Sequence, residues 1–393
     1  MTAKIEKFLF YFLCGFAFFL PLSNAAANIF LTLSLIAFFA RIYRKRDDCT
    51  KIFLEYKNIF AVIFILLAAV LISALTSENL LRGVGKFLER YILHMSIILP
   101  TLFIIRDKKK ILRLAGILIC GAFISNLSVF IKAAQNLSEP VWRFGGVLSP
   151  MIQGSLLAMI LPIYVLLALH VEDRRLKIFF AGASVVGTFA LLLTGTRGVW
   201  LAALILIPVS VFIYSKNKLK NLGIILISLS IVGGIFLSTP TLSNRMATLS
   251  DPQMQSNRER LLIWQSAWSM FKDNPIFGVG YAGYTEAYQT EYISPLARER
   301  DLGHAHSNFF QMLAECGMVG FGAFVLMLIY FSYFCLRGWT KEKNIAYLMF
   351  FCVLWGMILH GATEFNFETS MTSKFYWFSL ALCLAYVRKG KYL

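Results

Sequence analysis

Charged side chains are scarce in this sequence. Only 15% of its 393 residues are charged, against about 25% in a typical soluble protein. Hydrophobic residues make up 58% of the chain and include 36 phenylalanines. Apolar runs of about 17 or more residues recur along its length, and each is long enough to cross a bilayer as a helix. The scarcity of charge therefore excludes a soluble globular fold and predicts an all-α, polytopic transmembrane helical bundle.

Several chemical motifs are also absent. The seven cysteines show no CxxC spacing, and the sequence contains neither Asp-x-Asp nor His-Glu-x-x-His. These absences argue against a disulfide framework, a zinc signature and an acidic metal motif. The sequence also lacks a GxxxxGK[ST] P-loop and a GxSxG nucleophile motif. We therefore expect no cofactor and no metal ion.

The apolar segments predict about twelve membrane-spanning helices in one domain that covers residues 1–393. An even number of helices places both termini on the same side of the membrane. The predicted spans are 8–22, 26–42, 58–75, 87–105, 111–132, 148–170, 177–194, 198–215, 221–238, 308–336, 344–362 and 375–388.

Basic residues gather on one side of this predicted topology. The side that carries the termini has 25 of the 38 Lys and Arg residues and 8 of the 21 acidic ones. Cytoplasmic loops of membrane proteins carry the excess of Lys and Arg. We therefore expect a multi-pass membrane protein with cytoplasmic termini. The pI of 9.6 then reflects topology. Membrane lipid is an expected partner, and nucleic acid is not.

The longest polar stretch is the 239–307 loop, which this topology places on the outer side of the membrane. The region from Ser256 to Gly320 is the most informative part of the chain. Ser256 and Glu259 have the spacing of a capping box at the start of an amphipathic helix, which ends at Asn274-Pro275. Its predicted buried face consists of Leu261, Trp264, Trp268 and Phe271. We predict that this loop is catalytic.

Three arginines are candidate anion-binding residues. Arg197 lies in the short turn Gly-Thr-Arg-Gly between two spans, where an arginine is either functional or extends to the interface. Arg260 lies at the start of the amphipathic helix, and a helix N-terminus favours an anion. Arg143 lies between Trp142 and Phe144, so it is either a third anion ligand or an interfacial residue.

Histidines supply the candidate acid–base chemistry. His304 and His306 stand in the tetrapeptide HAHS directly before an apolar run. A histidine titrates near neutral pH and can act as a general base. A metal site is an alternative, although the spacing reveals no third ligand, and a structural role is another. His360 and Glu364 are spaced i, i+4; they either orient one another, steer a catalytic group, or pack as a polar pair.

The region around HAHS resembles the O-antigen ligase and polymerase superfamily of bacterial membrane glycosyltransferases. His306-Ser307, nine further residues and then Gly317-x-x-Gly320 match the ligase signature. The wider resemblance consists of Arg260-x-x-x-Trp264, Asn274-Pro275, Gly278-x-Gly280, Gly195-Thr196-Arg197-Gly198 and Arg143-x-Gly145.

The resemblance implies a GT-C-like, metal-independent, inverting glycosyltransferase of lipopolysaccharide biosynthesis. Such a protein would lie in the bacterial inner membrane, with the 239–307 loop and the active site in the periplasm. Its donor would be O-antigen linked to undecaprenyl diphosphate, and its acceptor would be a sugar hydroxyl of lipid A–core. Carried over by position, Arg197 and Arg260 would bind the donor diphosphate, and His306 would act on the acceptor. His304, Arg143, Glu364 and Trp264 are expected to support the site.

Two alternatives stay open. The first is an O-antigen polymerase, which joins lipid-linked repeat units; after Gly320 this sequence continues with Phe321-Gly322, where ligases often have threonines. The second, of a different class, is a transporter or flippase of lipid-linked glycan. Inverted repeats or helices broken in mid-membrane would favour transport.

Overall fold

The computed structural model of the chain describes most of its residues. The described residues are 2–44, 49–136, 143–217, 220, 223, 230, 233, 234, 238–247 and 254–388. The predicted span 221–238 therefore lies largely outside them, as does Trp142.

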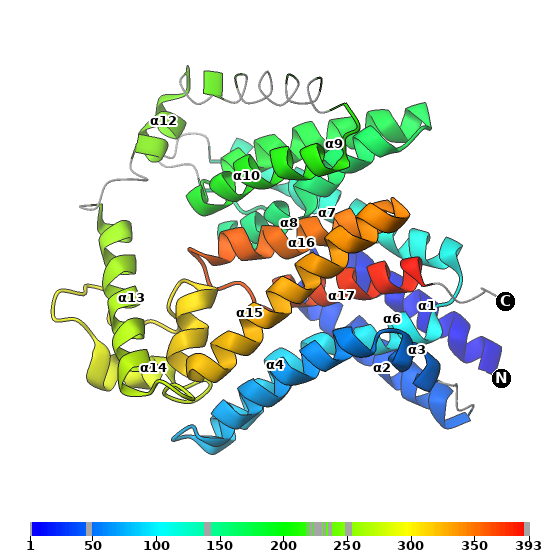
Figure 1. Ribbon diagram of the computed structural model, residues 1–393. Helices are drawn as coiled ribbons and strands as arrows, with labels where there is room; N and C mark the ends of the chain where they lie inside the picture. The colour runs from blue at the N-terminus through cyan, green and yellow to red at the C-terminus, as the bar shows by residue number, and fades with distance from the viewer. Residues whose placement is uncertain are drawn as a thin grey trace.

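The elements that the structure describes are helices, with no strand among the described residues, as the sequence predicts. Figure 1 shows them as a bundle with both termini at one end and α13 and α14 at the opposite end. The α-helices are α1 (Thr2–Phe19), α2 (Asn24–Arg44), α3 (Cys49–Glu55), α4 (Lys57–Leu75), α5 (Leu80–Phe87), α6 (Ile98–Ile104), α7 (Lys108–Ala134), α8 (Pro150–His170), α9 (Arg174–Leu193), α10 (Arg197–Tyr214), α12 (Pro240–Ala247), α13 (Gln255–Asp273), α14 (Tyr284–Ala287), α15 (Asn308–Glu342), α16 (Ile345–Gly361) and α17 (Ser370–Val387), and the π-helices are η1 (Leu88–Leu93) and η2 (Tyr288–Tyr292).

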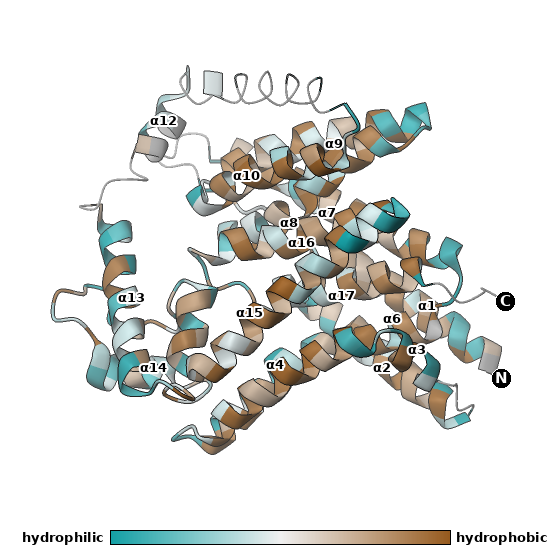
Figure 2. Ribbon diagram, viewed as in Figure 1, coloured by the Kyte–Doolittle hydropathy of each residue, from teal (hydrophilic) through white to brown (hydrophobic). Residues whose placement is uncertain are grey.

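The protein is a multi-pass membrane protein. Among the described residues, seven helices are long and apolar enough to cross a membrane: α2, α4, α7, α8, α9, α10 and α15. The shorter helix α16 is also apolar, and α1 and α17 coincide with two further predicted spans. In Figure 2 the middle of the bundle is mostly hydrophobic, and hydrophilic residues gather toward its ends.

The prediction of one continuous span over 87–105 is wrong. The structure divides this segment into the end of α5, the π-helix η1 and the short helix α6. Pro100 lies in the first turn of α6, where its missing N–H breaks no helical hydrogen bond. A helix that continued unbroken from η1 would need that N–H, so the chain turns before Ile98 and starts a new helix.

Helices α8 and α16 cross closely in the core of the bundle. The most apolar window of α8 is 78% buried, the largest share among the candidate spans. A Cβ on Gly356 would lie 2.3 Å from the carbonyl oxygen of Ala158, so only glycine permits this crossing. The close crossing places the end of α16 beside the start of α8, where Ser155 and His360 meet at 3.0 Å.

Helix α13 confirms the predicted amphipathic helix and its end at Asn274, but two details of the prediction are wrong. Leu261 and Trp268 are both 47% exposed, and the helix packs instead through a face formed by Leu262, Ile263, Ser266, Ala267 and Met270. These residues recur at helical spacing too, and the small Ala267 allows close approach to the residues of α14 and η2.

The capping box is the second correction. The side chain of Ser256 makes no cap hydrogen bond and accepts one from Arg197 at 3.0 Å. The buried carboxylate of Glu259 accepts the backbone N–H groups of Arg298 and Glu299 at 3.1–3.3 Å. Glu259 therefore ties the 294–303 segment to α13 instead of capping the helix.

We predict that the 254–307 segment is periplasmic, because the cytoplasmic excess of Lys and Arg lies at the other end. Leu296 is 63% exposed, so Leu296→Cys should react with an impermeant maleimide in intact spheroplasts. Glu172→Cys, in the α8–α9 turn at the opposite end, is the matched control and should react only after lysis. The reverse pattern would contradict the predicted topology.

Candidate active site

A pocket of about 400 Å³ opens at the end of the bundle where α13 lies. Its lining comes from four parts of the chain that are far apart in sequence: the start of α8, the first half of α13, the residues before α15, and the 362–369 segment between α16 and α17. The predicted site residues that line it are Arg143, Arg260, His304, His306 and Glu364. The fold therefore brings five of the seven candidates to one cavity.

His306 and Glu364 form a hydrogen-bonded pair in this pocket. The Nδ1 atom of His306 lies 3.2 Å from Oε1 of Glu364, and about a quarter of the His306 side chain is exposed. A carboxylate bound to Nδ1 fixes the tautomer of a neutral imidazole and leaves the Nε2 lone pair available. The pair has the arrangement that a general base requires.

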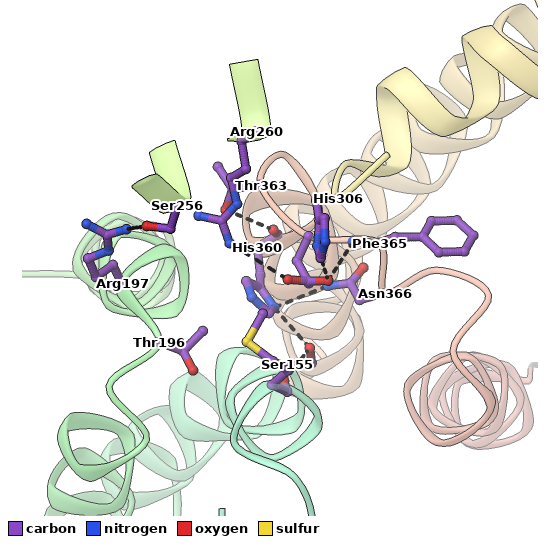
Figure 3. A network of polar contacts seen from close by, with 12 residues as sticks. Ser155, Thr196, Arg197, Ser256, Arg260, His306, His360, Thr363, Phe365 and Asn366 are labelled. Atoms are coloured by element: carbon purple, nitrogen blue, oxygen red, sulfur yellow. Dashed lines mark hydrogen bonds and ion pairs between the residues drawn. The ribbon is translucent and has the colours of Figure 1, made fainter. Parts of the chain in front are cut away.

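Arg260 approaches the second oxygen of the same carboxylate. Its Nη2 atom lies 3.9 Å from Oε2 of Glu364, and the Arg260 side chain is 28% exposed. In Figure 3 the Arg260 and His306 side chains extend toward the segment that carries Thr363 and Phe365, one from α13 and the other from the segment before α15. One carboxylate therefore joins a candidate base to a candidate anion ligand.

Glu364 is ionised at neutral pH. Its burial would raise the pKa of the carboxyl group, but the hydrogen bond and charge of His306, together with His360 and His304, outweigh burial and lower the pKa below its usual value. An ionised Glu364 stabilises positive charge on His306 when the imidazole takes up a proton.

His304 differs from His306 in environment. Burial, with the nearby charge of His306 as a second cause, lowers the pKa of His304 to about 4, so the ring is neutral at physiological pH. Its Nδ1 accepts the backbone N–H of His306 at 3.2 Å. This contact indicates a role in shaping the segment that carries His306.

Arg197 lies outside the lining of the pocket. Its guanidinium donates to Ser256 Oγ at 3.0 Å and to Asn257 Oδ1 at 2.9 Å, and Figure 3 shows it turned toward Ser256. It thereby holds the first turn of α13, the helix that carries Arg260. Its charge still interacts with those of Arg143 and Arg260, so the three arginines produce one region of positive potential.

Arg143 is an exposed residue at the rim of the pocket. Its Nη2 atom lies 3.2 Å from the sulfur of Met151, and no carboxylate among the described residues forms a salt bridge with it. A guanidinium in this position can bind an incoming anion without first breaking an ion pair.

Sequence reasoning missed the polar residues that support the 360–366 segment. Asn308 Oδ1 accepts the backbone N–H of Asn366 at 2.9 Å, and the Asn308 amide donates to Asn366 Oδ1 at 2.8 Å. His360 bonds to Ser155 and does not contact Glu364 through a hydrogen bond. The polar run over residues 363–373 was the available signal, but it gives no indication of which partners its side chains meet.

The two glycines of the GxxG part of the signature are required by close packing. Gly317 has a φ of 58° and breaks the helical geometry of α15 in its third turn. A Cβ at this position would lie 2.5 Å from the backbone of Ile276, and one on Gly320 would lie 2.1 Å from the Cβ of Cys316. The break lets the Asn274–Gly280 turn pack onto α15 and fixes the end of α13 relative to His306.

The structure supplies the third metal ligand that the sequence spacing does not reveal. Ligand atoms of His304, His306 and Glu364 lie within 4.8 Å of one another, a set that could hold a metal ion. The Arg260 guanidinium stands 3.9 Å from the same carboxylate and would repel a cation there. Guanidinium groups can instead stabilise the phosphate charge that a metal otherwise neutralises.

We therefore predict turnover in the presence of chelator. Purified protein with both lipid substrates should keep its rate in EDTA, because the arginines and not an ion would stabilise the leaving group. A rate that collapses in EDTA and returns with magnesium or zinc would assign the His304–His306–Glu364 cluster to a metal. His304→Ala removes one of the three possible ligand atoms. If the cluster held a metal, this variant would need a higher metal concentration for half-maximal rate; if it did not, added metal would leave its rate unchanged.

Comparison with known proteins points to the same family. Residues 182–325 match the family model described as O-antigen ligase. This match confirms the resemblance drawn from the HAHS region. The matched range contains Arg197, Arg260, His304 and His306, whereas Glu364 and Arg143 lie outside it and join the site through the fold.

A distant relative adds no functional description. An uncharacterized protein of Haemophilus influenzae is 26% identical over 211 residues, which is 49% of this chain and 52% of the relative. The chain thus spans about half the length of the relative that it matches.

Proposed function

We propose that the protein transfers O-antigen from undecaprenyl diphosphate to a sugar hydroxyl of lipid A–core at the periplasmic face of the bacterial inner membrane. The observation that carries this proposal is the arrangement of His306 and Arg260 on opposite oxygens of Glu364, at 3.2 and 3.9 Å. It puts a base for the acceptor and a guanidinium for the leaving group at one pocket, in a chain of which residues 182–325 match the O-antigen ligase family model.

The roles follow from the chemistry of the transfer. The acceptor hydroxyl oxygen attacks the anomeric carbon, the bond from that carbon to the diphosphate oxygen breaks, and the electron pair leaves with undecaprenyl diphosphate. The hydroxyl proton passes to Nε2 of His306, and Glu364 stabilises the resulting imidazolium. Negative charge grows on the diphosphate in the transition state, where Arg260 and Arg143 bind it and Arg197 adds positive potential.

Direct attack by the acceptor inverts the anomeric centre. No covalent intermediate is needed, because His306 supports the acceptor and does not attack the donor. No cofactor takes part in this scheme, and the membrane-embedded lipid tails of both substrates would lie along the bundle below the pocket.

A gene deletion with analysis of lipopolysaccharide on gels tests the proposal. A ligase deletion should lose all capped species while lipid-linked polymer accumulates, and expression of the wild-type chain should restore them. Survival of a single capped unit would instead assign the chain to the polymerase reaction of the same family. Accumulation of unpolymerised lipid-linked units on the cytoplasmic side would point to a transporter.

A transport function receives less support from the helices. The break in α15 at Gly317 lies in its third turn, near the end of the bundle that carries the pocket. The charged residues of the site also gather at this end, whereas transporters place their binding groups near mid-membrane.

A further inference from the structure

The peptide groups of Ala305, between the two histidines, are held from both sides. Its N–H donates to Oε1 of Gln311 at 2.6 Å, and its carbonyl oxygen accepts from Nε1 of Trp264 at 3.0 Å. The residue is fully buried. A buried residue whose donor and acceptor are both bound to side chains has little freedom to rotate.

This restraint matters because His306 follows directly and has a φ of 48°. The left-handed region is unfavourable for a residue with a side chain, and it persists only where neighbouring contacts impose it. On the other side, Ser307 is extended and starts α15 by accepting the N–H of Phe310 with its hydroxyl. The backbone of His306 is therefore set by Ala305 before it and by the helix cap after it.

The side chain of Gln311 is buried on α15, one turn before the buried Glu315. Oε1 of Glu315 accepts the N–H of Tyr284 at 3.1 Å, so this carboxylate is occupied by the chain beside α15. The N–H of Ala305 can only donate a hydrogen bond, so the amide oxygen of Gln311 must be the atom that points toward Ala305.

We propose that Gln311 is a positioning residue for His306 and that Trp264 is its counterpart on the other side of Ala305. Neither Gln311 nor Trp264 lines the pocket, so both act through the backbone that carries His306. The inference rests on the proposed function, because substitutions of Gln311 and Trp264 are expected to change the rate only by displacing His306, the proposed base. Misplacement of a catalytic group by about 1 Å can lower a rate by about 10²-fold.

The test is a double-mutant cycle on the full-length membrane protein. Gln311→Leu should lower kcat by about 10- to 100-fold with little change in the KM for either lipid substrate. In a His306→Ala background the same substitution should change the residual rate by less than about 3-fold, because the group that Gln311 positions is gone. Met312→Leu, a buried and volume-conserving change in the same helical turn, should leave kcat unchanged.

Trp264→Phe provides a second, milder variant in case Gln311→Leu does not accumulate in the membrane. It keeps an aromatic ring beside Phe310, on which Trp264 stacks with centroids 5.2 Å apart, but removes the pyrrole ring and with it the N–H donor to Ala305. It should therefore also lower kcat at unchanged KM and lose its effect in the His306→Ala background. If Gln311→Leu or Trp264→Phe lowered kcat by the same factor in the His306→Ala background as in the wild type, the positioning role would be overturned. Wild-type rates in His306→Ala alone would overturn the proposed function as well, which makes the two failures distinguishable.

Discussion

His306→Ala is expected to abolish transfer while the protein remains in the membrane at normal levels. Loss of a general base typically lowers a rate by about 10²–10⁴-fold, and His306 is the residue whose Nδ1 is held by Glu364 at 3.2 Å. The measurement is the rate of glycan transfer with purified protein and both lipid substrates, with membrane abundance determined by immunoblot.

His304→Ala is the matched control for this prediction. Burial and the charge of His306 lower the pKa of His304 to about 4, so its imidazole is a weak base, and its Nδ1 already accepts the backbone N–H of His306. We expect a loss of roughly one order of magnitude, through the lost hydrogen bond to the His306 N–H. His306→Gln should keep part of the activity if the residue chiefly orients the hydroxyl. Full transfer by His306→Ala together with loss in His304→Ala would show that the other histidine is the base.

The sequence predicted the class of fold because apolar length and charge asymmetry are local properties of a membrane protein. It failed at 87–105, where average hydropathy is high and yet the chain is broken before Pro100. It also failed on the buried face of α13, because Leu261 and Trp268 share the helical spacing of Ile263 and Ala267. Periodicity identifies an amphipathic helix, but packing partners decide which of two apolar stripes is buried.

In the candidate site, too, individual residues could be selected from the sequence, but their contacts could not. His306 and Arg260 could be selected because each lies in a polar segment next to a helix end, and the structure gives them a common partner. The spacing of His360 and Glu364 left open whether they orient one another, pack as a polar pair, or whether Glu364 steers a catalytic group. In the structure Glu364 contacts His306 and Arg260, and His360 contacts Ser155. Contacts between segments that are distant in the sequence depend on how the helices pack, and no local pattern encodes them.

Arg197 illustrates the same limit. Its short turn between two spans indicated a functional residue, but the structure adds that its guanidinium binds Ser256 and Asn257 at the start of α13. Arg197→Lys should still lower the transfer rate by at least about 10²-fold, the scale of one lost oxyanion donor. Nη2 of Arg197 binds both of these acceptors while Nη1 contacts the sulfur of Met254 at 3.5 Å. A lysine has one nitrogen on a flexible stem and cannot keep this two-pronged geometry, so α13 would lose part of its attachment and Arg260 its position.

Arg260→Lys should likewise lower the transfer rate by at least about 10²-fold although the charge is kept. Arg260 has to serve two groups at once, the Glu364 carboxylate at 3.9 Å and the donor diphosphate that we propose to enter the pocket. The planar guanidinium can present separate N–H groups to each, whereas a lysine ammonium is a point charge on a flexible stem.

The neighbouring Arg258 is an internal control for this substitution. It lies two residues earlier on the same helix, is exposed, and does not line the pocket. Arg258→Lys should therefore keep a rate within about 2-fold of the wild type, as expected for a surface substitution away from the site. Equal rates in the two lysine variants would mean that Arg260 contributes only charge. A loss in Arg260→Lys that appears in kcat and is small in the donor KM would indicate, instead, that its guanidinium binds the diphosphate chiefly as negative charge develops on it in the transition state.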